Sequence, residues 1–321
     1  MLSPTLLAIA AALGVWAYGR IRAITGRRNG TNCPAELVVI VGASSGIGKD
    51  LVARRTPLLA QVAEQCRQAN PLSTIAYESM DITKPDQVQT LPCRIHAAYP
   101  QQPVDTLILC AGVISVQRFV DFLATPEAKD TRATKTPNDI DLTRLPSFYT
   151  TAMAIFNANA IGLMGVIGAM LPLLHTAKSG RIVVVSSAAG RSGAPTRSLY
   201  AATKHALHGF IDSLRIELLD TTRTTICTVC PGTVATDFRQ SAVDLARPPS
   251  SAPLDQLSNG AFGSPTGKLT PLAVAQRMME VADNNWEREV FLPRSYAFIP
   301  WLQVLCPTLL DTLAARKYRQ T

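Results

Sequence analysis

The sequence predicts an α/β fold in which a doubly wound parallel sheet forms a single domain with helices on both faces. Runs rich in β-branched residues recur at 37–41, 104–110, 181–187 and 225–229. Such continuous apolar runs are typical of strands buried on both faces of a parallel sheet. Segments with helical periodicity lie between them, as in strand–helix–strand units. A glycine-rich turn at 42–48 directly follows the first run.

The composition indicates a membrane-associated protein. The chain has 321 residues, and its mean hydropathy of +0.15 is high for a freely soluble protein. Its net charge is +8, and four arginines follow an apolar start: Arg20, Arg22, Arg27 and Arg28. Basic residues in that position favour contact with anionic lipid head groups. No run of Lys and Arg interleaved with aromatic residues occurs, so we do not expect a nucleic-acid partner.

Residues 1–19 carry no charge and are just long enough to span a bilayer, which needs about 20 apolar residues. No positive charge precedes this stretch, which disfavours a cleaved signal peptide. The arginines behind it place the rest of the chain in the cytosol by the positive-inside rule. We therefore predict a membrane anchor at 1–19, a linker at 20–35, and location in the endoplasmic reticulum membrane. The alternative is an interfacial helix, since Ser3-Pro4-Thr5 shortens the apolar part.

The glycine-rich turn has the chemistry of a nucleotide site. Its glycines allow a tight turn and close approach of the backbone to a pyrophosphate, and the following helix directs its N-terminus at the phosphates. The order strand, glycine turn, helix raises the motif above chance. We predict that a dinucleotide contacts Gly42, Ser44, Ser45, Gly46, Ile47 and Gly48.

Tyr200 and Lys204 lie four residues apart, on one face of a predicted helix. An ammonium beside a phenol favours the phenolate and lowers the pKa of the phenol. That makes the tyrosine a usable proton donor near neutral pH. A serine delivered by the preceding strand, Ser186 or Ser187, could hydrogen-bond a substrate carbonyl oxygen. The ordinary alternative is a surface helix whose Tyr and Lys have no chemical role.

Over residues 36–295 the chain resembles the short-chain dehydrogenase/reductase family, in its membrane-anchored form. The family's glycine motif, usually TGxxxGIG, is present with Val41 in place of the threonine. Further matches follow in the family's order: Asp81 with Thr83, Ala111-Gly112, Asn159-Ala-Ile-Gly162, and Pro231-Gly-Thr-Val-Ala-Thr236.

The resemblance implies a Rossmann-type fold and an oxidoreductase that transfers a hydride between NADP(H) and a carbonyl or alcohol group. Tyr200 would donate the proton, and Lys204 would lower its pKa and hold the nicotinamide ribose. Ser187, thirteen residues before Tyr200, would orient the carbonyl, and Asn159 would hold a water in a proton relay. The anchor and the apolar tail suggest a lipophilic substrate.

The resemblance also implies cofactor contacts outside the glycine turn. Asp81 would lie near the adenine ring, and the turn at 231–236 would cradle the nicotinamide. Arg54 and Arg55 look like the basic end of a second strand in members that use the phosphorylated cofactor, which favours NADP(H) over NAD(H). The implied contacts are Arg54, Arg55, Asp81, Ala111, Gly112, Asn159, Tyr200, Lys204, Pro231, Gly232, Val234 and Thr236.

The cofactor half departs from the family pattern. A dinucleotide site needs a second strand that ends about 20 residues past the glycines. Here Arg54-Arg55 is followed at once by Thr56-Pro57 and a helical pattern at 58–70, and 73–79 reads as the next strand. We therefore expect the second strand to be missing, through a real deletion or an altered transcript. The alternative function is a catalytically impaired membrane protein of this type that has lost cofactor binding.

Two further apolar segments are not predicted to span a membrane. Residues 145–174 carry no charge, but Asn157, Asn159 and glycines at three-residue spacing favour a central helix of the domain. In the family this helix often packs against a partner subunit, which implies a homodimer through residues 148–174. Residues 296–321 form an apolar tail whose prolines argue against a spanning helix. This tail is expected to lie on a membrane surface or to pack on the core.

The seven cysteines have no framework spacing, which suits a reducing compartment. Cys227 and Cys230 have the spacing of a metal or redox pair. On a strand, however, residues three apart point to opposite faces. We therefore predict two buried thiols and no metal site.

Overall fold

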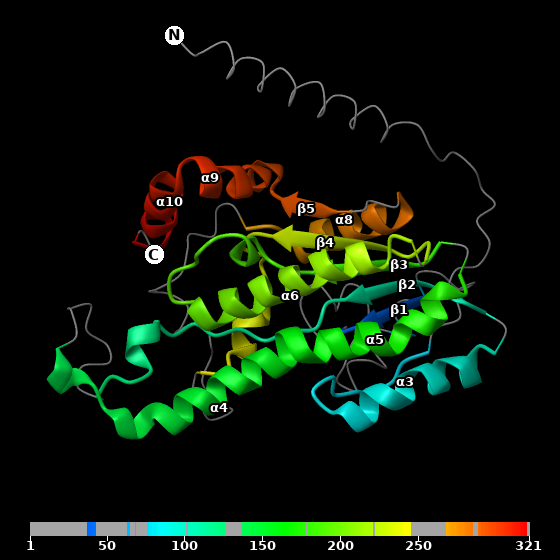
Figure 1. Ribbon diagram of the computed structural model, residues 1–321, viewed down its shortest axis with the longest axis horizontal. Coiled ribbons are helices and arrows are strands. Elements are labelled where there is room, and N and C mark those ends of the chain that lie inside the picture. The colour runs from blue at the N-terminus through cyan, green and yellow to red at the C-terminus, as the bar shows by residue number, and fades with distance from the viewer. Residues whose placement is uncertain are drawn as a thin grey trace, which may run out of the picture. The chain divides into compact units, whose positions relative to one another are not determined.

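Five parallel strands form one sheet in the described part of the chain, in the order β1-β2-β3-β4-β5 (Figure 1). Each of the four predicted runs becomes a strand. The strands are β1 Leu37–Val41, β2 Val104–Leu109, β3 Arg181–Val185, β4 Thr225–Pro231 and β5 Glu289–Leu292.

The computed structural model describes residues 37–42, 63–64, 68, 76–100, 102–125, 136–177, 179–220, 222–244, 268–284 and 288–319. The chain divides into two compact units, 1–36 and 37–321. The predicted anchor and linker lie outside the described residues. So do Ser44, Ser45, Gly46, Ile47, Gly48, Arg54 and Arg55.

Helices connect the strands, with one π-helical turn and several 3-10 turns between them. The helices are α3 Pro85–Ala98, α4 Leu145–Phe156, α5 Gly162–His175, α6 Ser198–Glu217, α8 Pro271–Asp283, α9 Ile299–Leu305 and α10 Pro307–Arg319. The π-helical turn is η5 Asn157–Ile161, between α4 and α5. The 3-10 turns are η2 Phe119–Asp121, η3 Pro137–Asp139, η4 Leu142–Arg144, η6 Ala188–Gly190, η7 Asp237–Ser241 and η8 Arg294–Phe298.

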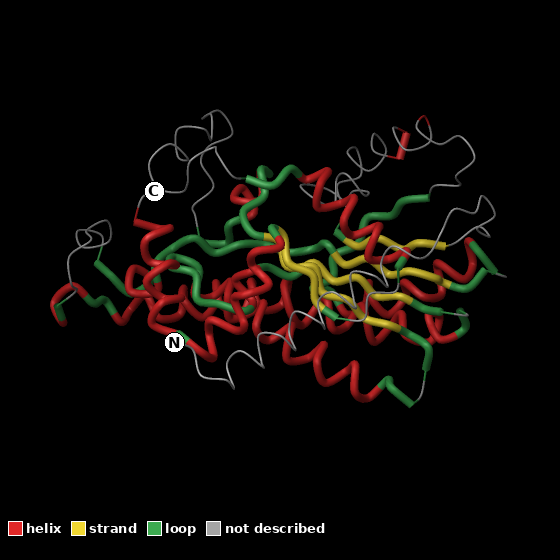
Figure 2. Tube along the Cα trace, turned by 90° about the horizontal axis from the view of Figure 1, so that it is seen from above, coloured by secondary structure: helices red, strands yellow, loops and turns green. Residues whose placement is uncertain are grey.

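Both faces of the sheet are covered, as the apolar runs predict. Leu107 and Leu109 of β2 pack into a core shared with α3, α5 and α6. Ile108, between them, points to the other face and packs in a cluster with Val274 and Met278 of α8. Figure 2 shows helices on both sides of the strands. The alternation confirms a doubly covered parallel sheet.

The uncharged segment 145–174 forms the central helix of the domain. Residues 142–175 are one continuous helical stretch, long and apolar enough to cross a membrane, yet half of its most apolar part is buried inside the fold. Leu163, Ile167 and Met170 are fully buried against the sheet. This packing confirms the interpretation of the segment as a core helix.

The outer edge of β1 has no partner strand among the described residues. Residues 76–79, predicted as part of a strand, are exposed and belong to none, so that prediction is wrong for the part described. A strand needs a neighbour to satisfy its backbone groups, and no described strand lies beside this segment. The stretch where the second strand is expected to be missing lies outside the described residues.

The register brings the carboxyl ends of the strands to one edge of the sheet. Val41 pairs with Leu109, Leu109 with Val184, and Val185 with Val229. The segments that follow are therefore neighbours: Gly42, 110–112, 186–187 and 231–232. In open α/β sheets, ligands bind outside this edge, so the fold gathers the predicted site residues where a ligand is expected.

Gly42 tests how closely the segments at this edge pack. Its φ is +89°, and a Cβ at this position would lie 2.2 Å from the Ala111 nitrogen. Gly42→Ala should therefore lower the free energy of unfolding by more than about 2 kcal/mol, because strain and overlap add. Urea denaturation measures the change. The control is Gly193→Ala, whose Cβ would meet nothing within 4 Å. Equal stability of the two variants would contradict the contact between Gly42 and Ala111.

Candidate active site

Tyr200 and Lys204 lie on one buried face of α6, at the end of β3. The Lys204 Nζ is 5.8 Å from the centroid of the Tyr200 ring. It donates a hydrogen bond of 3.1 Å to the Val185 carbonyl oxygen. The edge of Phe238 meets the Tyr200 ring at a centroid distance of 6.1 Å. The predicted pair is thus formed, and it is enclosed rather than exposed on a surface helix.

Lys204 is 3% exposed, and burial is the main influence on the pKa of its ammonium. Burial lowers the pKa of Lys204 to about 8, and the nearby Cys230 and Cys110 partly oppose that shift. Lys204 forms no salt bridge within the described residues. A phenolate at Tyr200 would therefore supply an anion close to a buried, unneutralised cation.

The two serines after β3 have different surroundings. Ser186 is buried, and its Oγ lies 2.8 Å from Nε2 of His208 on α6. Ser187 is half-buried, and its Oγ accepts a hydrogen bond of 3.1 Å from the Ala189 N–H as the N-cap of η6. The hydroxyl of Ser186 is thus already used in a buried contact with His208. This leaves Ser187, the serine chosen by its spacing from Tyr200, at the edge of the sheet.

Asn159 joins three segments of the site from the π-helical turn. Its Oδ1 accepts from the Val113 N–H at 2.7 Å, and its Nδ2 donates to the Val113 carbonyl at 2.9 Å and to Thr203 Oγ1 at 3.1 Å. The side chain is fully buried. Both amide hydrogens are therefore used inside the protein, and neither is left for the predicted relay water.

The predicted cofactor contacts after β2 gather around the same point. A Cβ on Gly112 would lie 3.1 Å from Asn159 Oδ1 and 3.9 Å from Lys204 Nζ. Ala111 is buried against Gly42. The backbone at Gly112 therefore runs beside Lys204, and Gly112 itself has no side chain to block a ligand.

The predicted turn after β4 is also formed. Pro231 ends β4, and a Cβ on Gly232 would lie 2.8 Å from Cε2 of Tyr296. Val234 bridges to Leu269, and Thr236 Oγ1 accepts from the Phe238 N–H as the N-cap of η7. Because the Phe238 ring contacts the Tyr200 ring, this turn lies next to α6.

Asp81 stands apart from this group. Its Oδ1 accepts from the Thr83 N–H at 2.9 Å and from Thr83 Oγ1 at 2.8 Å, in the turn that precedes α3. These bonds form an Asx turn, and the adenine role of Asp81 remains a prediction.

Asp244 is not among the residues that were predicted from the sequence. Its Oδ2 accepts from Ser115 Oγ at 2.7 Å and from the N–H groups of Val116 and Gln117 at 2.8 Å each. These bonds fasten the loop after β2 to the segment after η7. The partners are 127–129 residues apart in the chain, so no local pattern indicates the contact.

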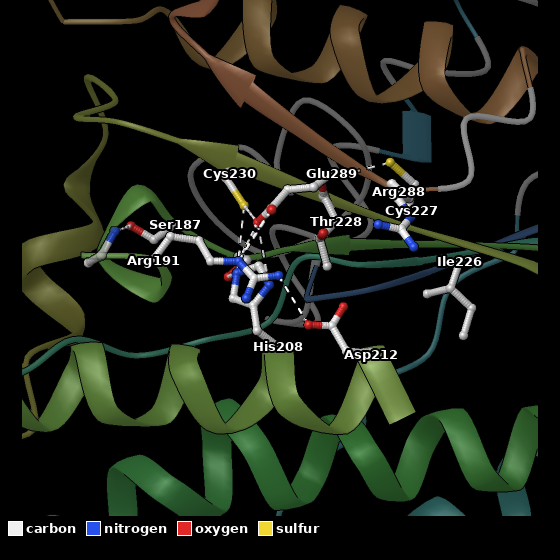
Figure 3. Close-up of polar contacts among 12 residues, drawn as sticks. Ser187, Arg191, His208, Asp212, Ile226, Cys227, Thr228, Cys230, Arg288 and Glu289 are labelled. Carbon is white, nitrogen blue, oxygen red and sulfur yellow. Dashed lines mark hydrogen bonds and ion pairs between the residues drawn. The ribbon is translucent and has the colours of Figure 1, made fainter. Parts of the chain in front are cut away.

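A second feature that was not predicted from the sequence is a cluster of His208, Cys230 and Glu289 (Figure 3). Their ligand-capable atoms lie within 4.8 Å of one another, as in a metal site. However, Arg191 Nε donates to both oxygens of Glu289, at 3.0 and 3.2 Å. A metal ion would have to compete with that guanidinium, so the arrangement is a hydrogen-bonded cluster. The four-residue spacing from Lys204 is the signal that could have revealed His208.

The two cysteines of β4 point to opposite faces, as predicted. Cys227 packs in the cluster on the α8 side, whereas the Cys230 Sγ donates to Glu289 Oε1 at 3.1 Å near His208 of α6. Burial raises the pKa of Cys227 to about 12 and that of Cys230 well above its ordinary value. Both are protonated, unreactive thiols at neutral pH.

Comparisons with known proteins point in one direction. The family model described as short chain dehydrogenase matches residues 36–245. A Drosophila melanogaster protein named dehydrogenase/reductase SDR family protein 7-like is 27% identical over 301 residues, which cover 88% of this chain and 81% of that protein. The NADP-dependent 3-hydroxy acid dehydrogenase of Schizosaccharomyces pombe is 29% identical over 219 residues, covering 63% of this chain and 72% of that protein.

Among solved structures, a short-chain dehydrogenase/reductase from Burkholderia phymatum in complex with NAD matches with a TM-score of 0.64. The match covers 85% of this chain and 95% of that chain at 19% identity. At this identity the likeness concerns the fold.

The buried ammonium predicts a pH-dependent stability cost. Below pH 8 the folded protein must bury a charged Lys204, and this burial lowers its free energy of unfolding. The ordinary pKa of lysine is about 10.4. Between pH 8 and that value the folded state has released this proton while the unfolded state still holds it, so the cost falls as the pH rises. Lys204→Met should therefore be more stable than the wild type at pH 7. This advantage should shrink as the pH rises to 10, as measured by urea denaturation. The control, Lys84→Met at an exposed position, should show no such trend. A constant advantage for Lys204→Met would refute the buried charge.

Proposed function

Because this chain belongs to the short-chain dehydrogenase family and is an NAD(P)-dependent oxidoreductase, we propose that it interconverts a carbonyl and an alcohol on a lipophilic substrate, with Tyr200 as the general acid and base. One observation carries the proposal. The ammonium of Lys204 is buried beside the Tyr200 ring and fastened to the end of β3. Such a cation lowers the cost of forming a phenolate.

The described residues fit the nicotinamide half of the cofactor. Gly42 lies against the backbone of Ala111, and Gly112 lies against the side chains of Asn159 and Lys204, so a glycine at each position adds no side chain to this edge of the sheet. Gly112, Lys204 and the turn at 231–236 would hold the nicotinamide and its ribose. A bound nicotinamide supplies or accepts the hydride, while the protein supplies position and electrostatics.

Each of these residues has a different role in the proposed reaction. During reduction Tyr200 gives its proton to the carbonyl oxygen, and during oxidation it takes the proton back. Ser187 donates its hydroxyl hydrogen to the same oxygen and steadies the developing charge. The relay that resupplies the proton is assigned to the main chain of the π-helical turn around Asn159, because both amide hydrogens of the side chain are used.

NADP(H) is proposed as the preferred cofactor. The support is the basic pair Arg54-Arg55 and the similarity to a relative whose name specifies NADP. The structural neighbour with NAD indicates that the fold accepts either form. The preference therefore depends on the charge near the adenosine ribose, where two arginines would attract a 2′-phosphate.

The C-terminal tail supports a membrane location. Large apolar side chains on η8, α9 and α10 are exposed: Phe298, Trp301, Val304, Leu305, Leu309 and Leu313. Within 296–321 one acidic residue, Asp311, stands against Arg316, Lys317 and Arg319. Exposed apolar surface with basic residues suits an anionic bilayer surface. The tail at 296–321 is therefore proposed to lie on the membrane surface.

This arrangement suggests a route for a lipophilic substrate. The tail begins at Tyr296, which touches Gly232 in the turn that would hold the nicotinamide. A substrate leaving the bilayer at the tail would thus arrive near the catalytic edge. The catalytic domain is proposed to face the cytosol from the endoplasmic reticulum membrane, as the arginines after the anchor indicate.

The central helix offers a surface for a homodimer. Gly165 and Gly168 have open space where a Cβ would lie, and Met153 and Ile161 are exposed on the same helical stretch. Small and apolar residues allow another helix to approach closely. The proposed partner is a second copy of this chain, packed along residues 148–174.

The competing function remains a membrane protein of this family that no longer binds a cofactor. The observation in its favour is the unpaired outer edge of β1 in the described residues. Its main difficulty is the burial of Lys204 beside the Tyr200 ring, which costs stability and would have no purpose in a protein without that chemistry.

Tyr200→Phe tests the proposed acid and base. Removing the phenol hydroxyl should lower kcat for NADPH-dependent reduction by about 10²–10⁴-fold, the usual contribution of such catalysis, and leave NADPH binding within a few-fold. The assay uses a panel of long-chain and polycyclic ketones in detergent micelles. Tyr149→Phe, at an exposed tyrosine of α4, is the control and should keep full activity. Unchanged activity of Tyr200→Phe would show that another group donates the proton.

A further inference from the structure

The end of β3 is tied to α6 by two consecutive hydrogen bonds. The Val185 carbonyl accepts from Lys204 Nζ at 3.1 Å, and Ser186 Oγ lies 2.8 Å from His208 Nε2. Tyr200, Lys204 and His208 are spaced by four residues and share one face of α6. The residue next to this double connection is Ser187. The strand and the helix that carry the proposed catalytic groups are therefore held together at the site itself.

The second of these bonds is deeply buried. Ser186 is 2% exposed and His208 is 1% exposed, so water does not replace the bond if it is lost. A hydrogen bond in such surroundings is electrostatically stronger than in water, and an unpaired partner there is costly. The pair therefore holds its geometry firmly.

The surrounding charges determine which atom donates. Burial, with Arg191 and Lys204 nearby, lowers the pKa of His208 to about 3, so the imidazole is neutral at physiological pH. Glu289 Oε1 lies 3.4 Å from Nδ1 without forming a hydrogen bond, and its negative charge favours a hydrogen on that nitrogen. Nε2 then carries the lone pair and accepts from the Ser186 hydroxyl.

Glu289 is itself held in place by two neighbours from other elements. Arg191, which follows η6, donates to both of its oxygens, and the Cys230 thiol of β4 donates to Oε1 at 3.1 Å. Figure 3 shows these side chains converging on His208. The imidazole is thus oriented by fixed partners on its Nδ1 side and presents Nε2 to Ser186.

The turn that begins at Ser187 also lies against the imidazole. A Cβ on Gly190 would be 2.7 Å from His208 Cδ2, 2.9 Å from Nε2 and 3.0 Å from Ser186 Oγ. The backbone of η6 therefore packs directly on the hydrogen-bonded pair. A displacement of His208 would be passed both to Ser186 and to the turn capped by Ser187.

We propose that His208 is a positioning residue, which acts through Ser186 to fix the end of β3 against α6 and so holds Ser187 and Lys204 in place relative to Tyr200. This inference rests on the proposed function, because it gives His208 a purpose in the Tyr200 chemistry. His208 itself contacts neither substrate nor cofactor in this account. The cluster serves geometry rather than metal binding, since the carboxylate is already paired with Arg191.

The first test compares kinetic constants of the full-length protein. His208→Leu and Ser186→Ala each remove the bond and should lower kcat about tenfold, with the KM for NADPH unchanged, since misplaced catalytic groups affect the chemical step. His208→Gln keeps a polar group able to reach Ser186 and should recover kcat to within about threefold. The double variant Ser186→Ala/His208→Leu should be no slower than either single variant.

The second test needs neither substrate nor cofactor. The ultraviolet absorbance of tyrosinate is titrated with pH, and each variant is compared with the same variant carrying Tyr200→Phe, so that the difference reports the Tyr200 phenol alone. Lys204→Met is the reference and should raise the pKa of Tyr200, because it removes the cation. His208→Leu and Ser186→Ala should raise that pKa as well, whereas His208→Gln should not.

The outcomes separate the two proposals. If Lys204→Met leaves the Tyr200 titration unchanged, the proposed role of Lys204 in the function fails, whatever His208 does. If Lys204→Met raises the pKa but His208→Leu and Ser186→Ala change neither kcat nor the titration, the positioning proposal is overturned. His208 would then be a packing residue that affects stability alone. Should His208→Leu not fold, Ser186→Ala decides, because it removes a single oxygen atom.

Discussion

A positive charge buried at the end of a strand is the constraint on which the site depends. Lys204 can remain beside Tyr200 because the Val185 carbonyl accepts one of its hydrogens and because α6 and β3 contribute side chains to the same core. Burial lowers the pKa of this lysine to about 8, so the folded protein loses stability when Lys204 is charged. Such a cost is common where function requires a strained or poorly solvated group.

Local patterns predicted much of this arrangement. The β-branched runs became strands because a parallel sheet covered on both faces accepts few other residues. Tyr200 and Lys204 share a face because helical spacing alone brings them together. The spacing of Ser187 from Tyr200 singled out one serine of two, and the engagement of Ser186 with His208 supplies a physical reason for that choice.

Other features depend on contacts that no local pattern records. Asp244 is bonded to the loop after β2 through partners more than 120 residues away, and Glu289 reaches His208 from β5. Asn159 was expected to serve a water, but its amide is consumed by Val113 and Thr203. Residues 76–79 belong to the stretch 73–79 that was predicted as a strand, yet no strand forms at 76–79, where the described sheet offers no neighbour. Pairing, unlike helical spacing, is a property of the whole fold.

The two halves of the site thus differ in character. Around Tyr200 the side chains are enclosed, hydrogen-bonded and mutually fixed, while β1 lies at an edge of the described sheet. The most direct test of the account is to titrate the full-length protein with NADPH and NADH while following nicotinamide fluorescence. The account predicts saturable binding at one site per chain, with NADPH bound more tightly than NADH. Absence of saturable binding of either nucleotide would contradict the account and favour a protein that has kept its catalytic residues without a cofactor.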